Sequence, residues 1–175
     1  TVDLAELLGI RHCVFALGAA GSAKSTVWKT LQAAQTHLNI GDGPSQVATL
    51  NPKAVTSDDL YGFVHPVTKE PYDGIIAKIM REFSKDVREN PKWVVLDGDI
   101  DAEWIESMNT VMDDNKVLTL VSNERIPLTA AMRLLFEISH LRNASPATVS
   151  RAGVIFLNEG DVGWRPYVQT WVEQM

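Results

Sequence analysis

Short apolar runs alternate along this chain with segments whose apolar residues recur at helical spacing. The runs predict five strands, over residues 13–17, 46–51, 92–97, 133–139 and 153–157. Strands that are apolar along their whole length are buried on both faces, and strands that alternate with helices pair in parallel. The pattern therefore predicts an α/β fold, in which helices cover both faces of a five-stranded parallel sheet.

The helical pattern is clearest at residues 73–89, where apolar side chains recur about every 3.6 positions. Further helices are expected at residues 2–10, directly after the first strand, at 103–113, at 145–151 and around 164–172. Two stretches differ from this alternation. Residues 51–62 predict a loop, and residues 116–128 predict an inserted β-hairpin because a polar turn separates two short apolar runs.

The most informative motif joins the first strand to the helix that follows it. Residues 14–26 read VFALGAAGSAKST, and Gly18, Gly21, Lys24 and Ser25 fit a phosphate-binding loop. Small residues let consecutive backbone N–H groups surround phosphate oxygens, and the N-terminus of the next helix adds positive potential. The motif therefore predicts a site for a nucleoside triphosphate.

Side chains of this loop have separate expected roles. Lys24 is expected to reach the β- and γ-phosphates, the Ser25 hydroxyl to ligate Mg²⁺, and Thr26 to add a phosphate contact. The predicted nucleotide-binding residues are Gly18, Ala19, Ala20, Gly21, Ser22, Ala23, Lys24, Ser25 and Thr26.

Ala23 departs from the pattern, which has glycine before the lysine. If the backbone there needs a positive φ, alanine costs on the order of 1 kcal/mol. If the backbone needs only to approach the phosphate closely, the Cβ atom crowds the ligand instead. Either effect changes affinity and leaves the loop itself intact.

The third predicted strand ends in an acidic residue. Residues 93–97, WVVLD, end in Asp97, which is the expected carboxylate for Mg²⁺. A hydrolytic member of the AAA+ class would follow this carboxylate with a glutamate that activates water, and this chain has Gly98. Asp99 is one position late, about 6–7 Å further along an extended backbone. We therefore expect nucleotide binding with slow or absent hydrolysis.

Composition narrows the possible partners. The chain has 175 residues, 45% of them hydrophobic, and a net charge of −6, as expected for one globular domain. The acidic balance and the lack of a basic stripe argue against nucleic acid, and no apolar stretch suggests a membrane segment. The single cysteine, Cys13, lies in the first apolar run and is expected to be buried.

Several motifs together resemble the second AAA+ module of the dynein heavy-chain motor ring, of the axonemal type. These motifs are the phosphate loop followed by VWKTL, NPKAVTSDDLYG, YDGIIAKIMRE, KWVVLDGDIDAEWIESMNTVMDDNKVLTL, SNERIPL and LRNASPATVSRAG. The resemblance covers nearly the whole chain. It implies a P-loop NTPase large α/β subdomain over residues 1–175, with strand order 5-1-4-3-2 and without the small helical lid subdomain.

The resemblance also implies function. The site would hold ATP or ADP with Mg²⁺ as a structural or regulatory ligand, and Arg151 would be an arginine finger for the neighbouring module's ATP site. The sensor position, often Asn in AAA+ proteins, falls on Ser139 or His140. Partners would be the adjacent AAA+ modules of the same heavy chain and, through the parent motor, microtubules and dynein intermediate and light chains. The location would be the cytoplasm and cytoskeleton, in the axoneme of a cilium or flagellum.

Two alternatives stay open. One is a stand-alone P-loop ATPase or kinase, which would show multiple turnovers that depend on Lys24. The other is a structural module in which Ala23 and the missing lid have abolished nucleotide binding. The residues alone favour a simpler interpretation of Arg151, as a basic side chain that complements the C-terminal end of a helix.

Overall fold

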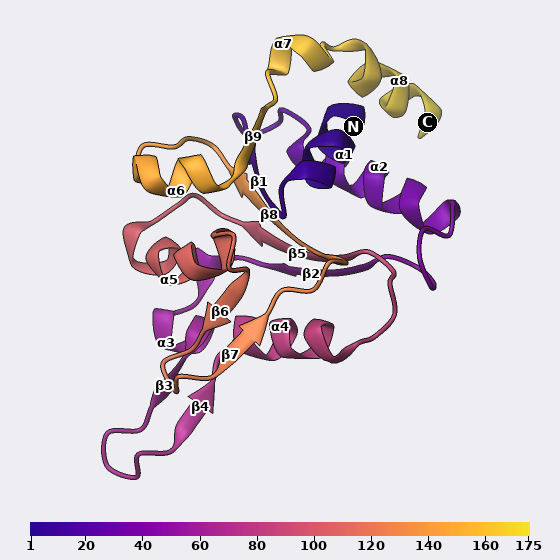
Figure 1. Cartoon of the computed structure of the whole chain (residues 1–175). Coiled ribbons are helices and arrows are strands. Elements are labelled where there is room, and N and C mark those ends of the chain that lie inside the picture. Colours follow the sequence, from indigo (N-terminus) through magenta and orange to yellow (C-terminus); the bar gives the residue numbers. More distant parts are fainter.

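Five parallel strands form the central sheet of the protein (Figure 1). A computed structural model describes residues 1–175, apart from the side chain of Val162. From one edge to the other the strands are β2 (Gln46–Leu50), β5 (Lys92–Asp97), β8 (Met132–Ile138), β1 (Cys13–Leu17) and β9 (Gly153–Phe156). Read from the β9 edge, this is the order 5-1-4-3-2, so the predicted fold class is confirmed.

Helices cover both faces of the sheet, as Figure 1 shows. On one face, α1 (Val2–Ile10) and α2 (Lys24–His37) pack through Leu4, Leu8, Trp28 and Leu31. On the other face, α4 (Ile75–Lys85) and α5 (Ala102–Met112) enclose a larger apolar cluster. Successive side chains of a strand point to opposite faces, so the central strands must be apolar at every position.

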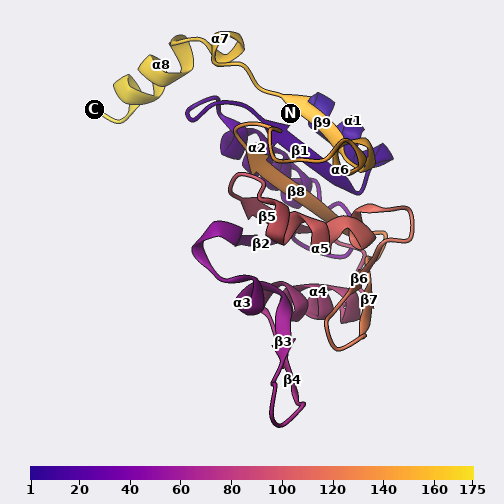
Figure 2. The same cartoon turned by 90° about the vertical axis from the view of Figure 1, so that its left-hand side faces the viewer.

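The segment between β2 and β5 is more structured than its sequence indicated. Residues 51–62, predicted as a loop, contain the 3₁₀ turn η1 (Pro52–Ala54) and the helix α3 (Ser57–Tyr61). A hairpin of β3 (Gly62–Val64) and β4 (Pro71–Asp73) follows and projects away from the body (Figure 2). This hairpin was not predicted, because each of its strands has only three residues.

Two glycines allow this hairpin to pack against the chain that carries it. Gly62 has φ +93°, and a Cβ atom there would lie 2.1 Å from the carbonyl oxygen of Tyr72. A Cβ atom at Gly74 would lie 2.3 Å from the carbonyl oxygen of Leu60. Both positions therefore require glycine.

The helix predicted over residues 73–89 is wrong at both ends. Asp73 belongs to β4, and α4 stops at Lys85, so that Val87 is 94% exposed. Asp86 ends the helix in an extended conformation and accepts hydrogen bonds from Gln46 and Arg88. These charge-assisted hydrogen bonds hold the pKa of Asp86 far below its usual range, with Arg88 as the largest cause.

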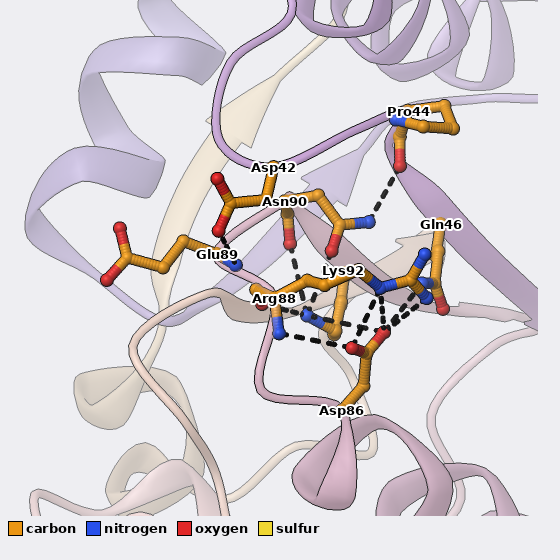
Figure 3. Close-up of polar contacts among 8 residues, drawn as sticks. All are labelled: Asp42, Pro44, Gln46, Asp86, Arg88, Glu89, Asn90 and Lys92. Atoms are coloured by element: carbon orange, nitrogen blue, oxygen red, sulfur yellow. Dashed lines mark hydrogen bonds and ion pairs between the residues drawn. The ribbon is translucent and has the colours of Figure 1, made fainter.

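Asp86 belongs to a polar cluster at the amino ends of β2 and β5 (Figure 3). At its centre Lys92 is fully buried, although it begins an otherwise apolar strand. Its Nζ atom donates hydrogen bonds to the carbonyl oxygen of Arg88 at 2.5 Å and to Asn90 Oδ1 at 3.1 Å. The carboxylate of Asp86 lies 3.8 Å away. A buried ammonium group is tolerated here because these oxygens surround it.

The remaining elements follow the predictions more closely. β6 (Val117–Thr119) and β7 (Arg125–Pro127) form the predicted inserted hairpin, and α6 (Pro146–Arg151) precedes β9. The chain ends in α7 (Glu159–Val162) and α8 (Arg165–Glu173), which lie beyond β9 on the side opposite the β3–β4 hairpin (Figures 1 and 2). Among the described residues, no helix has both the length and the apolarity needed to cross a membrane.

Candidate functional site

The loop between β1 and α2 lies at the carboxyl end of the sheet. Gly18 leaves β1, and its N–H donates to the carbonyl oxygen of Ile138 at 3.1 Å. A Cβ atom at Gly18 would lie 2.3 Å from the carbonyl oxygen of Leu157, so the close approach of these backbones needs glycine. Gly21 has φ +84° with open space around it, so its requirement is conformational.

Ala23 adopts the left-handed conformation, with φ 65° and ψ 24°, immediately before α2. Of the two effects proposed from the sequence, the backbone strain is therefore present. A residue with a Cβ atom pays about 1–2 kcal/mol for this conformation.

The loop presents several free hydrogen-bond donors. Among the residues that the structure describes, none accepts a hydrogen bond from the backbone N–H groups of Ala20, Gly21 or Ala23. The first N–H groups of α2 add to these donors, because the first turn of a helix has no intrahelical acceptors. Such a concentration of donors at a helix N-terminus favours an anion.

Lys24 lies over this loop. Its Nζ atom donates to the carbonyl oxygens of Gly18 and Ala19, both at 2.7 Å. The Ser22 hydroxyl is buried and has no partner among the described residues. Thr26 is exposed at the start of α2 and lines the same cleft as Lys24.

Ser25 contacts a carboxylate that the sequence analysis did not identify. Its hydroxyl donates to Glu137 Oε2 at 2.6 Å, and the indole N–H of Trp28 donates to Glu137 Oε1. Glu137 lies on β8 and is 4% exposed. A charged residue inside the apolar run RLLFEIS is the signal that could have found it, because a buried carboxylate requires partners.

Asp97 lies at the end of β5, next to Glu137 on β8 in the parallel register. Paired residues of adjacent strands point to the same face, so both carboxylates face the loop side of the sheet. Asp97 is exposed. It lines one cleft together with Lys24 and Ser25, so the structure brings these three predicted site residues together.

Gly98 and Asp99 lie differently from Asp97. The Ser139 backbone N–H and hydroxyl both donate to Asp99 Oδ1 at 2.6 Å, which lowers the pKa of Asp99. Asp99 is absent from the cleft lining, as far as the described residues show. A Cβ atom at Gly98 would lie 2.9 Å from Asn51 Oδ1, so a larger side chain there needs Asn51 to move.

The loop opens into a cleft of about 770 Å³. One wall is formed by the loop and the two carboxylates, and the other wall by α8. The α8 segment contributes aromatic side chains, since Tyr167 and Trp171 line the cleft while no residue of α8 is buried. This volume is within the range of small-molecule sites.

The donor set suits a hard cation such as Mg²⁺. The candidate ligands are oxygen atoms of Ser25 and Asp97, beside which Glu137 also lines the cleft, and Mg²⁺ prefers oxygen and usually completes its coordination with substrate phosphates and water. Within the described part of the chain, no group of three or more His, Cys, Asp or Glu residues could hold a metal by itself. The arrangement therefore fits a cation that arrives with a phosphate ligand.

Arg151 lies outside this cleft, at the end of α6. Its Nε atom donates to Asp113 Oδ1, and one terminal nitrogen donates to Asn109 Oδ1 at 3.5 Å. The side chain keeps 30% of its surface exposed. In the structure it joins α6 to the end of α5.

Known proteins resemble the chain along nearly its whole length. The family model described as "AAA domain (dynein-related subfamily)" matches residues 13–152. The chain is 58% identical over 172 residues to "Dynein beta chain, ciliary" of Tripneustes gratilla and 58% identical over 173 residues to "Dynein axonemal heavy chain 17" of Mus musculus. It is 55% identical over 170 residues to "Dynein beta chain, flagellar outer arm" of Chlamydomonas reinhardtii. The alignments cover 97%, 98% or 99% of this chain but only 4% of each relative.

Proposed function

The chain belongs to the dynein-related subfamily of AAA domains, and we propose on this basis that it is an ATP-binding module that does not hydrolyse its nucleotide. The observation that carries the proposal is the combination of a donor-rich loop with a glycine directly after Asp97. The loop supports binding, and Gly98 removes the carboxylate that would activate water. The bound nucleotide then serves as a structural or regulatory ligand.

The residues that would hold the ligand are those of the loop and its cleft. The backbone N–H groups of Ala20, Gly21 and Ala23 would donate hydrogen bonds to phosphate oxygens. Lys24 would exchange its two carbonyl partners for phosphate oxygens. Ser25 and Asp97 would ligate Mg²⁺. When bound, the cation offsets the negative charge of the phosphates.

We also propose a position for this module in a parent protein, which the same relationship supports. It would be the second AAA+ module of an axonemal dynein heavy chain, located in the cytoskeleton of a cilium or flagellum. Its direct partners would be the neighbouring modules of the ring. Microtubules and the intermediate and light chains would be partners of the whole motor.

Arg151 is proposed as the arginine finger for the neighbouring module's ATP site. A guanidinium group is always charged and binds two phosphate oxygens at once, so placing it across an interface makes a neighbour's catalysis depend on assembly. Its partial exposure supports this role, since the side chain needs only to leave Asp113 and Asn109 to reach outward. In the motor ring, Arg151→Lys should reduce ATPase turnover of the neighbour, by up to about 10³-fold.

Calorimetric titration of the chain with ATP and Mg²⁺ tests the proposed function. We expect binding that Lys24→Ala abolishes, together with phosphate release below one turnover per chain. Multiple-turnover phosphate release that depends on Lys24 would favour an ATPase instead. No binding in the presence of Mg²⁺, in this chain and in the motor ring, would favour a purely structural module.

A further inference from the structure

We propose that Glu137 is a positioning residue for the cation of this site and makes nucleotide binding depend on Mg²⁺. The inference rests on the proposed function, because it concerns the same cleft. Glu137 comes from β8, whereas the residues predicted from the motifs come from the loop, α2 and β5.

Glu137 is held in one orientation by two donors from the first turns of α2. The Ser25 hydroxyl binds Oε2 at 2.6 Å, and the Trp28 indole binds Oε1. Trp28 is itself buried and lies 6.5 Å from the ring of Trp93, centroid to centroid. Since both carboxylate oxygens accept a hydrogen bond from α2, the side chain has little freedom to turn.

The hydrogen bond to Glu137 determines how Ser25 can act. A hydroxyl group has one proton and two lone pairs, and a hydroxyl that ligates a cation does so through a lone pair. The proton must then be donated to an acceptor other than the cation. Glu137 already accepts that proton at 2.6 Å, so the lone pairs of Ser25 remain available for ligation.

Asp97 is less suited to this supporting role. It is exposed, and among the described residues it has no hydrogen-bond donor. It is therefore free to contact the cation directly, while the buried Glu137 orients the hydroxyl beside it. Outer carboxylates commonly orient the groups that ligate a metal.

The two carboxylates also make the cleft selective for a nucleotide that brings a cation. Asp97 and Glu137 are neighbours on adjacent strands, which lie about 4.8 Å apart. The phosphates of a metal-free nucleotide would meet this negative charge at short range. A divalent cation between the carboxylates and the phosphates turns this repulsion into attraction. Mg²⁺ should therefore increase the affinity for the nucleotide more than it would in a cleft without these carboxylates.

The test measures ATP affinity with Mg²⁺ and with a chelator in place of Mg²⁺, by calorimetry, on the native chain and on Glu137→Gln. The native chain should bind at least about tenfold more tightly with Mg²⁺. Glutamine keeps the shape and removes the charge, so Glu137→Gln should lose most of that gain and bind metal-free ATP as well as or better than the native chain. Glu106→Gln, on the exposed face of α5, is the matched control and should behave as the native chain.

A merely structural role for Glu137 would give a different result. Loosening of α2 would weaken binding equally in both buffers and leave the ratio of the two affinities unchanged. Ser25→Ala provides a second test, because part of the effect of Glu137 acts through Ser25. Glu137→Gln should then reduce the Mg²⁺ gain by a smaller factor in the Ser25→Ala background than in the native chain.

If Glu137→Gln does not fold, Trp28→Phe gives a milder change, since it removes only the donor to Oε1. It should reduce the Mg²⁺ gain severalfold. Tight binding with an unchanged Mg²⁺ gain in the Glu137 or Trp28 variant would overturn the role of Glu137 and leave the proposed function in place. A native chain that binds ATP in neither buffer would overturn both.

Discussion

Replacing Ala23 by glycine should stabilise the folded protein, although it removes a side chain. Ala23 has φ 65° in the loop before α2, a conformation that costs a residue with a Cβ atom about 1–2 kcal/mol. Glycine adopts it freely. The substitution therefore removes strain from the native state.

The expected gain is smaller than the full strain. Glycine also has more conformational freedom in the unfolded chain, which offsets about 0.4–1 kcal/mol. At the midpoints of these two ranges the net stabilisation is about 0.8 kcal/mol, and a chain of this size shifts its melting temperature by about 2–4 °C per kcal/mol. We therefore expect the melting temperature of Ala23→Gly to rise by about 1–4 °C.

Thermal and urea denaturation of three loop variants measure this effect. Gly21→Ala is the reverse change, because Gly21 has φ +84° and its Cβ atom would meet no atom within 4 Å. It should destabilise by about 1 kcal/mol through conformation alone. Gly18→Ala should destabilise by a different cause, since its Cβ atom would lie 2.3 Å from the carbonyl oxygen of Leu157.

The variants at positions 21 and 23 together test whether backbone strain at Ala23 lowers the stability of the fold. If Gly21→Ala is destabilising while Ala23→Gly is neutral or also destabilising, the strain at Ala23 does not limit stability. The departure from the glycine of the phosphate-loop pattern would then have another cause.

Three further predictions concern buried groups away from the cleft. Lys92→Met should destabilise the fold by about 1–3 kcal/mol in urea denaturation, because one buried and one partly buried oxygen atom lose their donor. A loss below about 0.5 kcal/mol would contradict this. Burial lowers the pKa of His12 from its ordinary 6.5, so at low pH the unfolded chain binds a proton at His12 more readily than the folded chain does. The fold therefore has its full stability, as far as His12 is concerned, only above about pH 6.5. Stability should fall as the pH drops below that value, and less steeply in His12→Gln; identical pH profiles would refute the argument. Burial also raises the pKa of the Cys13 thiol, so an alkylating reagent at pH 8 should label Cys13 only in denaturant. Mass spectrometry measures the labelling, and rapid labelling of the folded chain would contradict the burial of Cys13.

Local patterns in the sequence were sufficient for most of the elements. The five apolar runs became the five strands of the sheet, and the phosphate-loop motif lies between β1 and α2 as expected. These features depend on neighbouring residues, because periodicity and turn chemistry act within a few positions. The strand order came from the resemblance, since nothing within one strand specifies its neighbour.

The local patterns were insufficient where long-range contacts determine the structure. The helix over residues 73–89 was predicted too long, because it stops at Lys85 and the next residue, Asp86, accepts hydrogen bonds from Arg88 and from Gln46, 40 positions earlier. The β3–β4 hairpin depends on the close approach of Gly62 and Gly74 to other backbone atoms, which its three-residue strands do not indicate.

The candidate site shows the same division. The loop, its lysine and serine, and the carboxylate at the end of β5 could be predicted from the sequence, because each is part of a contiguous motif. The folded chain was needed to show that Ser25 donates to Glu137, 112 positions away, and that Asp97 and Glu137 are neighbours in the sheet. The reason is physical: strand register and helix packing bring these side chains together, and both depend on the folded chain as a whole.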